Sequence, residues 1–193
     1  MRYIICAFSG EARPFLDYYN LKRIQDLPFP LYQNDNTILI VTHMGYENAL
    51  MAVSALLGYR PPSANDILLN IGVCAAPEDF EVGELLVINK IHYKNYDFHP
   101  DILFQHSFRE CALLSVDTVQ DVMHTLPVDM EAHAVFKAAK RFIKSRQMLF
   151  VKIVSDHFDP KGTQKNRMTQ SIQDHLQHIE TLIVRSEVSL RST

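Results

Sequence analysis

Hydrophobic and polar positions follow one another along the chain in blocks that predict strands and helices in turn. Short apolar runs, several of them rich in β-branched residues, predict strands at 2–8, 37–43, 67–73, 83–93, 111–117 and 148–156. Apolar residues at helical spacing predict helices at 46–58, 130–145 and 167–185. Because the two kinds of element are interleaved, we expect an α/β fold with three layers, in which helices flank a mixed, largely parallel twisted sheet.

The chain has the length of one domain. No repeat, low-complexity segment or long linker divides its 193 residues. We therefore expect a single domain over residues 1–193, with a frayed C-terminal tail from about residue 186.

Composition and charge exclude several classes of protein. Hydrophobic residues make up 47% of the chain, which is enough for a full core, and the net charge of −3 gives no basic surface for nucleic acid. No apolar run approaches the roughly 18 residues that span a bilayer, so no membrane partner is expected. Three cysteines without paired spacing indicate reduced thiols and a cytoplasmic protein.

Polar residues follow several of the predicted strands, where ligands bind in α/β sheets. Glu11 follows the first strand, Asp156 ends the last one, and Met130 and Glu131 open the helix at 130. Each has an ordinary structural explanation: a helix N-cap for Asp156, and a first-turn charge for Glu11 or Glu131. Cys74 would ordinarily be a small core residue. The combination and its order along the chain are more informative than any single residue.

Five segments carry a resemblance to a known family: IICAFSGEA, NIGVCAAPEDFEVGELLVI, LLSVD, VDMEAHAV and VKIVSD. In this order, the chain resembles the purine nucleoside phosphorylase/uridine phosphorylase superfamily, and within it the methylthioadenosine/S-adenosylhomocysteine nucleosidases. The resemblance covers roughly residues 1–159 and implies a nucleoside phosphorylase-like domain.

The resemblance implies a role for each of the polar residues. Glu131 would hold the ribose hydroxyls, with Met130 against the sugar face. Asp156, oriented by Ser155, would donate a proton to N7 of the departing purine. Glu11 would orient and deprotonate the attacking water. By the same resemblance, the substrate would also contact Phe8, Val73, Cys74 and Val119.

The central turn favours water over phosphate as the nucleophile. Hexameric phosphorylases have a sequence similar to R-x-G-S-C-G at this place. This chain has NIGVCAA instead, with Asn70 in place of the Arg and Val73 in place of the hydroxyl residue. A phosphate dianion would find little to bind there. Arg13 leaves open an anion ligand elsewhere. The expected activity is hydrolysis of a 5′-modified purine nucleoside, adenine being the expected base, with no cofactor.

Three alternatives stay open: a phosphate-dependent phosphorylase, an adenosylhopane nucleosidase-like enzyme, and a degenerate nucleoside-binding protein. The chain departs from the family where Ala75 and Ala76 replace a common Gly-Gly pair, where Val119 replaces a stacking Phe, and where Lys152 replaces a common Arg. The resemblance also implies a homodimer. The aromatic segment 92–104 would then be an interface and lid, or otherwise an ordinary surface loop.

Overall fold

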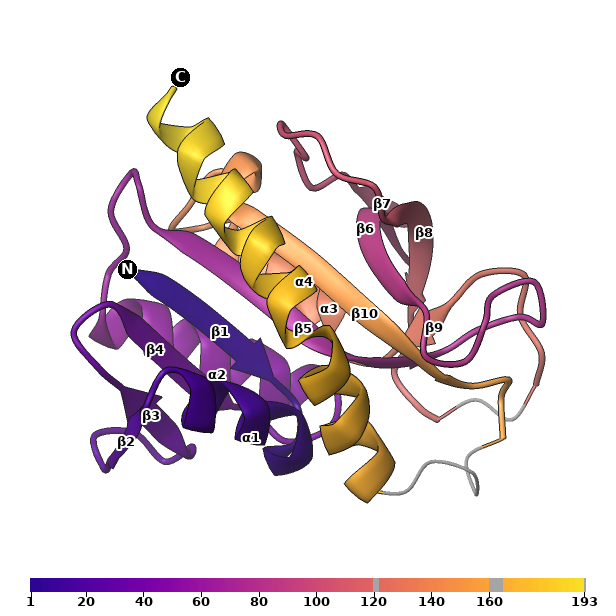
Figure 1. Ribbon diagram of the computed structural model, residues 1–193, viewed down its shortest axis with the longest axis horizontal. Coiled ribbons are helices and arrows are strands. Elements are labelled where there is room, and N and C mark those ends of the chain that lie inside the picture. Colours follow the sequence, from indigo (N-terminus) through magenta and orange to yellow (C-terminus); the bar gives the residue numbers. More distant parts are fainter. Residues whose placement is uncertain (120–121, 160–164, 193) are drawn as a thin grey trace.

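A single large sheet runs through the molecule. The structure, a computed structural model, describes residues 1–119, 122–159 and 165–192. The strands are β1 (Arg2–Cys6), β2 (Lys22–Ile24), β3 (Leu31–Gln33), β4 (Thr37–Val41), β5 (Ile67–Ala75), β6 (Leu85–Tyr93), β7 (Tyr96–Phe98), β8 (Arg109–Ser115), β9 (Val128–Asp129) and β10 (Met148–Asp156). The helices are α1 (Ser9–Tyr18), α2 (Tyr46–Tyr59), α3 (Ala132–Ala139) and α4 (Lys165–Arg191), with a 3₁₀ turn at Ser145–Gln147 (Figure 1).

The sheet has an open half and a closed half. In the open half, β1 pairs in parallel with β4 and β5, and β3 and β2 continue it antiparallel. In the closed half, β5 pairs with β10, β10 with β6, β6 with β8, β8 with β9, and β9 with β5 again. The mixed sheet is thus confirmed, but five of its strands form a ring rather than part of a simple twisted sheet.

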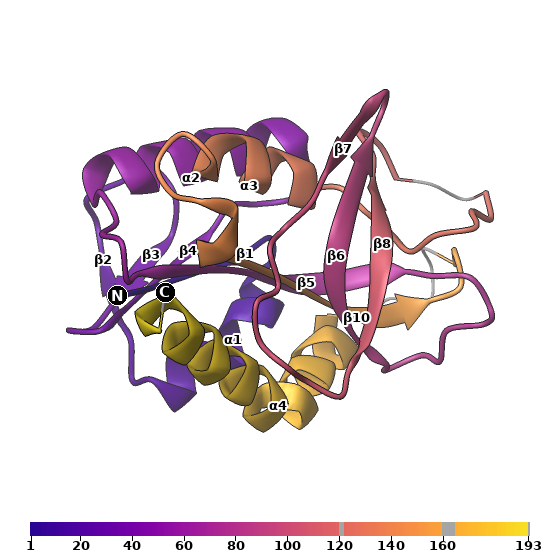
Figure 2. The ribbon, with the colours of Figure 1, turned by 90° about the horizontal axis from the view of Figure 1, so that it is seen from above.

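Helices cover both faces of the open half. Figure 2 shows α2 and α3 on one side of the sheet and α1 and α4 on the other. Alternate residues of β1 point to opposite faces, so Tyr3 and Ile5 join the core under α2 and α3 while Ile4 and Cys6 join the core under α1 and α4. This two-sided burial is why the strands are apolar runs rather than alternating patterns.

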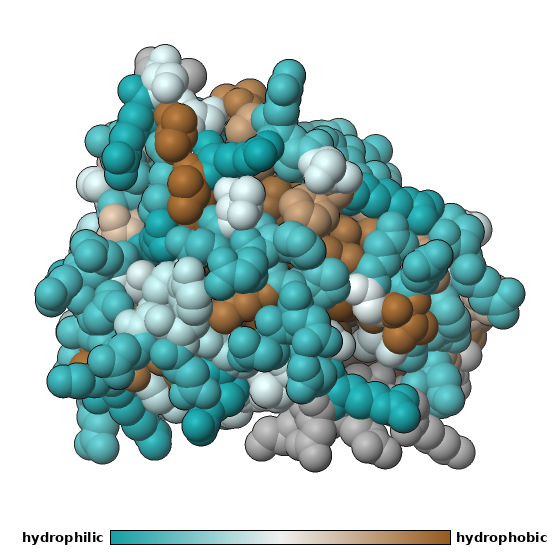
Figure 3. Space-filling view, viewed as in Figure 1, coloured by the Kyte–Doolittle hydropathy of each residue, from teal (hydrophilic) through white to brown (hydrophobic). Residues whose placement is uncertain are grey.

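The surface seen in Figure 3 carries apolar side chains only in small, separate patches among hydrophilic ones. Within the described residues, no helix is both long and apolar enough to cross a bilayer.

Helix α1 was not predicted from the sequence, and the largest boundary differences lie at the ends of two other helices. The helix expected at 130–145 stops at Ala139, and Phe142, expected to face inward, is 42% exposed. The tail expected to fray from about residue 186 is instead helical through Arg191. Its last turns are held because Leu190 is buried and because the Arg2 guanidinium bonds both carboxylate oxygens of Glu187.

Candidate active site

A cavity of about 610 Å³ opens where the parallel strands end. Its walls come from the residues that follow β1, β4 and β8, and from the carboxyl ends of β5, β9 and β10. Such a position is typical of ligand sites in α/β folds. The structure brings together at this cavity all the predicted site residues except Glu11: Phe8, Val73, Cys74, Val119, Met130, Glu131, Ser155 and Asp156.

Glu131 stands at the N-cap of α3 and is only 8% exposed. Its Oε1 accepts a hydrogen bond of 2.7 Å from the backbone N–H of Gly45, which immediately precedes α2. Burial, and then the nearby Asp129 carboxylate, raise the pKa of Glu131 above its ordinary value. Among the described residues, none donates a hydrogen bond to Oε2, so the carboxylate is anchored through one oxygen at the cavity wall and can accept from a ligand through the other.

A buried ion pair lies behind Glu131. The Lys152 Nζ, on β10, is 2.8 Å from Oδ2 of Asp129 on β9, and both side chains are almost fully buried. Burial lowers the pKa of Lys152, but the carboxylates of Asp129, Glu131 and Glu11 outweigh it and raise the pKa overall. Lys152 is therefore a fixed positive charge beneath a group of acids.

Sequence reasoning assigned no role to this pair. Asp129 also caps the helix, because its Oδ2 accepts from the backbone N–H of Ala132 at 2.8 Å. The signal that could have revealed the pair is the lone charge of Lys152 inside the otherwise apolar strand MLFVKIV, since a lysine is buried there only with a partner.

Glu11 lies behind the cavity wall rather than in it. Its Oε2 accepts from the backbone N–H groups of Ala7 at 2.9 Å and Phe8 at 3.0 Å, and its Oε1 accepts from Val73 at 3.0 Å. Burial raises the pKa of Glu11, against the opposing effect of these donors and of Lys152. The three residues that bond it line the cavity, so Glu11 ties β1 to β5 directly at the wall.

Gly72 makes room for that carboxylate. A Cβ atom at position 72 would lie 2.9 Å from Oε1 of Glu11, which is closer than real contacts allow. Any larger residue would push Glu11 off its backbone donors, so Gly72, which lies within strand β5 rather than in the expected turn, is a packing requirement of the site.

Asp156 is held in a tight turn at the end of β10. Its Oδ2 is 2.6 Å from Oγ of Ser155, and its Oδ1 accepts from the backbone N–H of Asp159 at 3.0 Å. Ser155 Oγ is also 3.1 Å from the carbonyl oxygen of Cys74. A hydroxyl has one proton, so Ser155 donates to one of these two oxygens at a time. The two contacts together fix its hydroxyl between β5 and Asp156.

Two bulky residues at the cavity have left-handed backbones. His43, after β4, has φ 65°, and Phe158, after β10, has φ 61°. Such residues cost free energy and concentrate at functional sites. The sequence reasoning missed both, along with Met44 and Met168, which also line the cavity, because no local pattern marks them.

The charge of the cavity is one-sided. Among the described residues that line it, three are acids and none is Lys or Arg. Arg13, the possible anion ligand, points elsewhere: it is 67% exposed, and its Nε is 2.8 Å from Oδ2 of Asp17 on the same helix. An anionic ligand would meet repulsion here rather than a clamp.

By sequence, the chain matches no protein-family model and no curated protein. By structure, it is similar to nucleosidases over nearly its whole length. One is a 5′-methylthioadenosine/S-adenosylhomocysteine nucleosidase from Streptococcus pneumoniae with a transition-state inhibitor; the TM-score is 0.76 at 16% identity, covering 98% of this chain and 100% of that one.

Two Helicobacter pylori proteins are also similar. A nucleosidase variant with 5′-methylthioadenosine in its active site gives a TM-score of 0.73 at 14% identity, with 94% and 97% of the two chains covered. A futalosine hydrolase gives 0.72 at 14% identity, with 94% and 96% covered. At these identities the likeness establishes the fold: the chain has the nucleoside phosphorylase-like α/β fold of these nucleosidases, as the sequence resemblance predicted.

Proposed function

We propose that this protein is a nucleosidase that hydrolyses the N-glycosidic bond of a purine nucleoside. The observation that carries the proposal is that Glu131, Met130 and Asp156, distant in the sequence, line one cavity at the carboxyl ends of the strands. That cavity also has the fold context in which the S. pneumoniae and H. pylori proteins bind nucleoside-like ligands.

In the proposed reaction, water attacks C1′ of the ribose as the C1′–N9 bond breaks. The bonding electron pair leaves with the purine, and Asp156 donates a proton to N7, so that a neutral base departs. Glu11 accepts the proton of the attacking water, which requires that water to reach its carboxylate past the wall formed by Ala7, Phe8 and Val73. The products are a free purine and a free sugar. A positioned acid or base typically accelerates such a step by about 10²–10⁴-fold.

Glu131 supplies the sugar contact in this proposal. One of its oxygens is fixed by the N–H of Gly45, which leaves the other for the ribose hydroxyls. Met130 packs against the sugar face, and Phe8, Val73, Cys74 and Val119 form apolar walls around the substrate. Ser155 keeps Asp156 oriented towards the base.

Hydrolysis is favoured over phosphorolysis by the charge of the cavity. A phosphate dianion needs cationic or multiple N–H donors, whereas the described lining offers three carboxylates, and Arg13 is paired with Asp17 at the surface. Water, being neutral, meets no such repulsion. The proposed substrate has adenine as its base and carries a modified 5′ position, as in methylthioadenosine or S-adenosylhomocysteine.

The proposal includes a homodimer in the cytoplasm. The segment after β6 exposes large apolar side chains, with Tyr96 at 65% and Leu103 at 55%, as a subunit interface would. The three cysteines are free thiols, which suits a reducing compartment. Light scattering after gel filtration would test the dimer.

The test of the function is purine release from methylthioadenosine, S-adenosylhomocysteine, adenosine and inosine, with and without phosphate. Release without phosphate is expected, and the fastest substrate identifies the 5′ substituent. Release only with phosphate would overturn hydrolysis. A protein that binds these nucleosides without releasing purine would instead be a binding protein.

A further inference from the structure

Three aromatic rings pack together beside the ribose end of the cavity. Tyr46 is the first residue of α2, His133 is in the first turn of α3, and Tyr93 ends β6. The His133 ring lies nearly parallel to the Tyr93 ring, with centroids 4.0 Å apart and 12° between the planes. Tyr46 lies 5.4 Å from His133 and 5.1 Å from Tyr93, again nearly parallel. None of the three is among the described residues that line the cavity.

These rings hold both backbone segments that position Glu131. The donor to its Oε1 is the N–H of Gly45, the residue immediately before Tyr46. On the other side, His133 follows Glu131 by two residues. Gly45 is the N-cap of α2 with φ 100°, and its carbonyl oxygen accepts from the backbone N–H of Ala49 at 3.1 Å. The contacts of Tyr46 with His133 and Tyr93 fix the start of α2, next to this donor, against α3 and β6.

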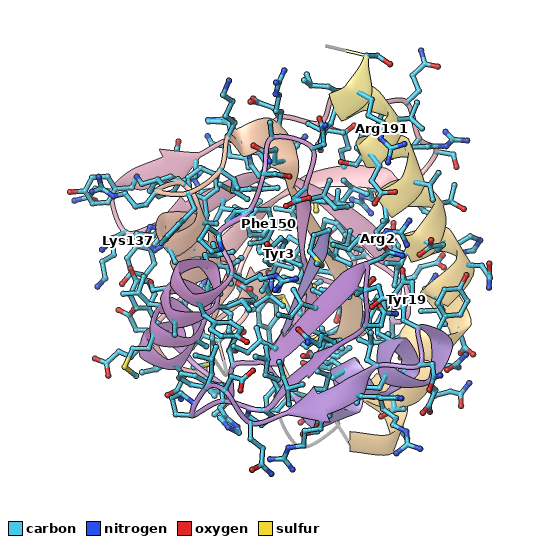
Figure 4. The ribbon with its side chains drawn as sticks, turned by 90° about the vertical axis from the view of Figure 1, so that its left-hand side faces the viewer. Arg2, Tyr3, Tyr19, Lys137, Phe150 and Arg191 are labelled. Carbon is cyan, nitrogen blue, oxygen red and sulfur yellow. The ribbon has the colours of Figure 1, made fainter. Side chains whose placement is uncertain are left out.

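His133 is an unusual choice for a purely apolar contact. Its residue is 2% exposed, and its Nδ1 is buried with no hydrogen-bond partner in the described part of the chain. Leaving a buried polar atom unsatisfied destabilises the fold, a cost that Phe would avoid. Burial, and then Lys137 and Lys140, lower the pKa of His133 to about 4, so the ring stacks in its neutral form. Figure 4 shows Lys137 extending from α3 towards the surface.

The backbone of His133 adds a further connection. Its N–H donates to Oγ of Ser115, at the end of β8, over 3.2 Å. The stack therefore connects α2, α3, β6 and β8 around one carboxylate. Phe98 of β7 closes the other side of the imidazole, with ring centroids 4.7 Å apart.

We propose that Tyr46, His133 and Tyr93 form a positioning clamp that holds the Glu131 carboxylate where it binds the ribose hydroxyls. The clamp rests on the proposed function, since it presupposes a ribose at Glu131. The three rings act through the backbone of residues 45 and 131–133 and touch no substrate, so they are positioning residues.

The experiment compares three ligands by calorimetry: adenosine, 2′,3′-dideoxyadenosine, which lacks both hydroxyls, and adenine. His133→Ala removes the central ring. We expect it to weaken adenosine binding about tenfold, near the lower end of what a charged hydrogen bond contributes. Binding of dideoxyadenosine and adenine should stay within about twofold. In turnover, KM for adenosine should rise about tenfold while kcat changes by less than about threefold.

His133→Phe is the matched variant, because it keeps a stacked ring and loses only the nitrogens. It should restore adenosine binding to within about twofold of the parent. Adenine binding reports whether each variant is folded. Tyr46→Leu provides a second variant if His133→Ala does not fold, and the same selective loss is expected of it.

Each other outcome counts against a particular part of the argument. Equal losses for adenosine and dideoxyadenosine, or no loss, would overturn the clamp. A parent that binds adenosine no better than dideoxyadenosine would remove Glu131 from the ribose hydroxyls and overturn the clamp, whereas the nucleosidase would still be decided by purine release. A parent that prefers adenosine and shows the selective loss but releases no purine would overturn the nucleosidase and support the clamp.

Discussion

The two ends of the cavity, named the ribose end and the base end after the ligand groups proposed for them, are built differently. At the ribose end, Glu131, Asp129 and Lys152 are buried and come from β9, β10 and the start of α3. At the base end, Asp156 is only partly buried. Its carboxylate contacts Ser155, whose hydroxyl also reaches the carbonyl oxygen of Cys74 on β5, and the N–H of Asp159. One end joins several buried charges, whereas the other presents a single, partly buried acid.

This difference in burial predicts that the two ends contribute differently to protein stability and to turnover. A buried ion pair that loses one partner leaves an uncompensated charge in the core, so the ribose end should be required for folding as well as for binding. A partly solvated acid in a turn can be changed without that penalty, so the base end should be required for turnover alone.

The sharpest test of the comparison is Asp156→Asn. The amide keeps the size and one acceptor of the carboxyl group but cannot donate the carboxyl proton to N7. We expect kcat to fall about 10²–10⁴-fold, with an unfolding midpoint within about 2 °C of the parent. Asp174→Asn, an exposed site on α4, is the control and should retain activity. Turnover near the parent rate would remove Asp156 as the acid.

Lys152→Met tests the opposite end. The thioether fills the space of the lysine stem but leaves Asp129, Glu131 and Glu11 without their cation. We expect the free energy of unfolding to fall by about 3–5 kcal/mol, measured by urea denaturation. Adding Asp129→Asn should recover part of the loss, because it removes one of the stranded charges.

A matched surface variant calibrates that result. Lys90→Met breaks a surface ion pair instead of a buried one. Lys90 pairs with Asp97, and both side chains are substantially exposed. Such an exposed pair, screened by solvent, contributes little to stability. If Lys152→Met cost no more than Lys90→Met, the charges of the ribose end would not be structural.

Glu131→Gln should have a smaller effect than Asp156→Asn has on turnover or Lys152→Met has on stability. The amide retains an oxygen for the N–H of Gly45 but loses the charge that strengthens the ribose hydrogen bonds. We expect adenosine to bind roughly ten- to a hundredfold more weakly, by calorimetry. Stability should not fall, because burial and Asp129 raise the pKa of Glu131 and so disfavour its ionised form. Unchanged affinity would exclude Glu131 from the sugar contact.

The same contrast shows what the sequence could predict. Strand β10 and helix α2 were predicted nearly to the residue, because both are long, strongly patterned segments. The short strands β2, β3, β7 and β9 were not, because two or three residues are too few to show a period. The closure of β5, β6, β8, β9 and β10 into a ring depends on long-range pairings that no local pattern encodes.

The candidate site follows the same rule. Asp156 and Glu131 could be predicted because they occur in recognisable local segments. The pairing of Lys152 with Asp129, and the place of Glu11 behind the wall, depend on how β1, β5, β9 and β10 meet. A sequence displays residue types, whereas burial, which determines what a charge does, is decided only by the assembled sheet.

The smallest predicted effect concerns pH at the ribose end. His133 has a folded-state pKa of about 4, below the ordinary 6.5, mainly because it is buried. As pH falls below about 6.5, the unfolded chain takes up this proton first, so the stability contributed by neutral His133 is present above that pH and is lost towards pH 4. His133→Phe lacks this loss. The raised pKa of Glu131 acts with the opposite sign, but in both proteins.

The measurement is the free energy of unfolding of parent and His133→Phe by urea, at about pH 7 and about pH 5. After discounting for partial solvent screening, we expect acidification to cost the parent about 1 kcal/mol more than the variant, which corresponds to roughly 2–4 °C in the unfolding midpoint. Equal losses would mean that His133 takes up its proton without disturbing the stack. The ribose end would then tolerate charge as the base end does, and the contrast between the two ends would rest on Lys152 alone.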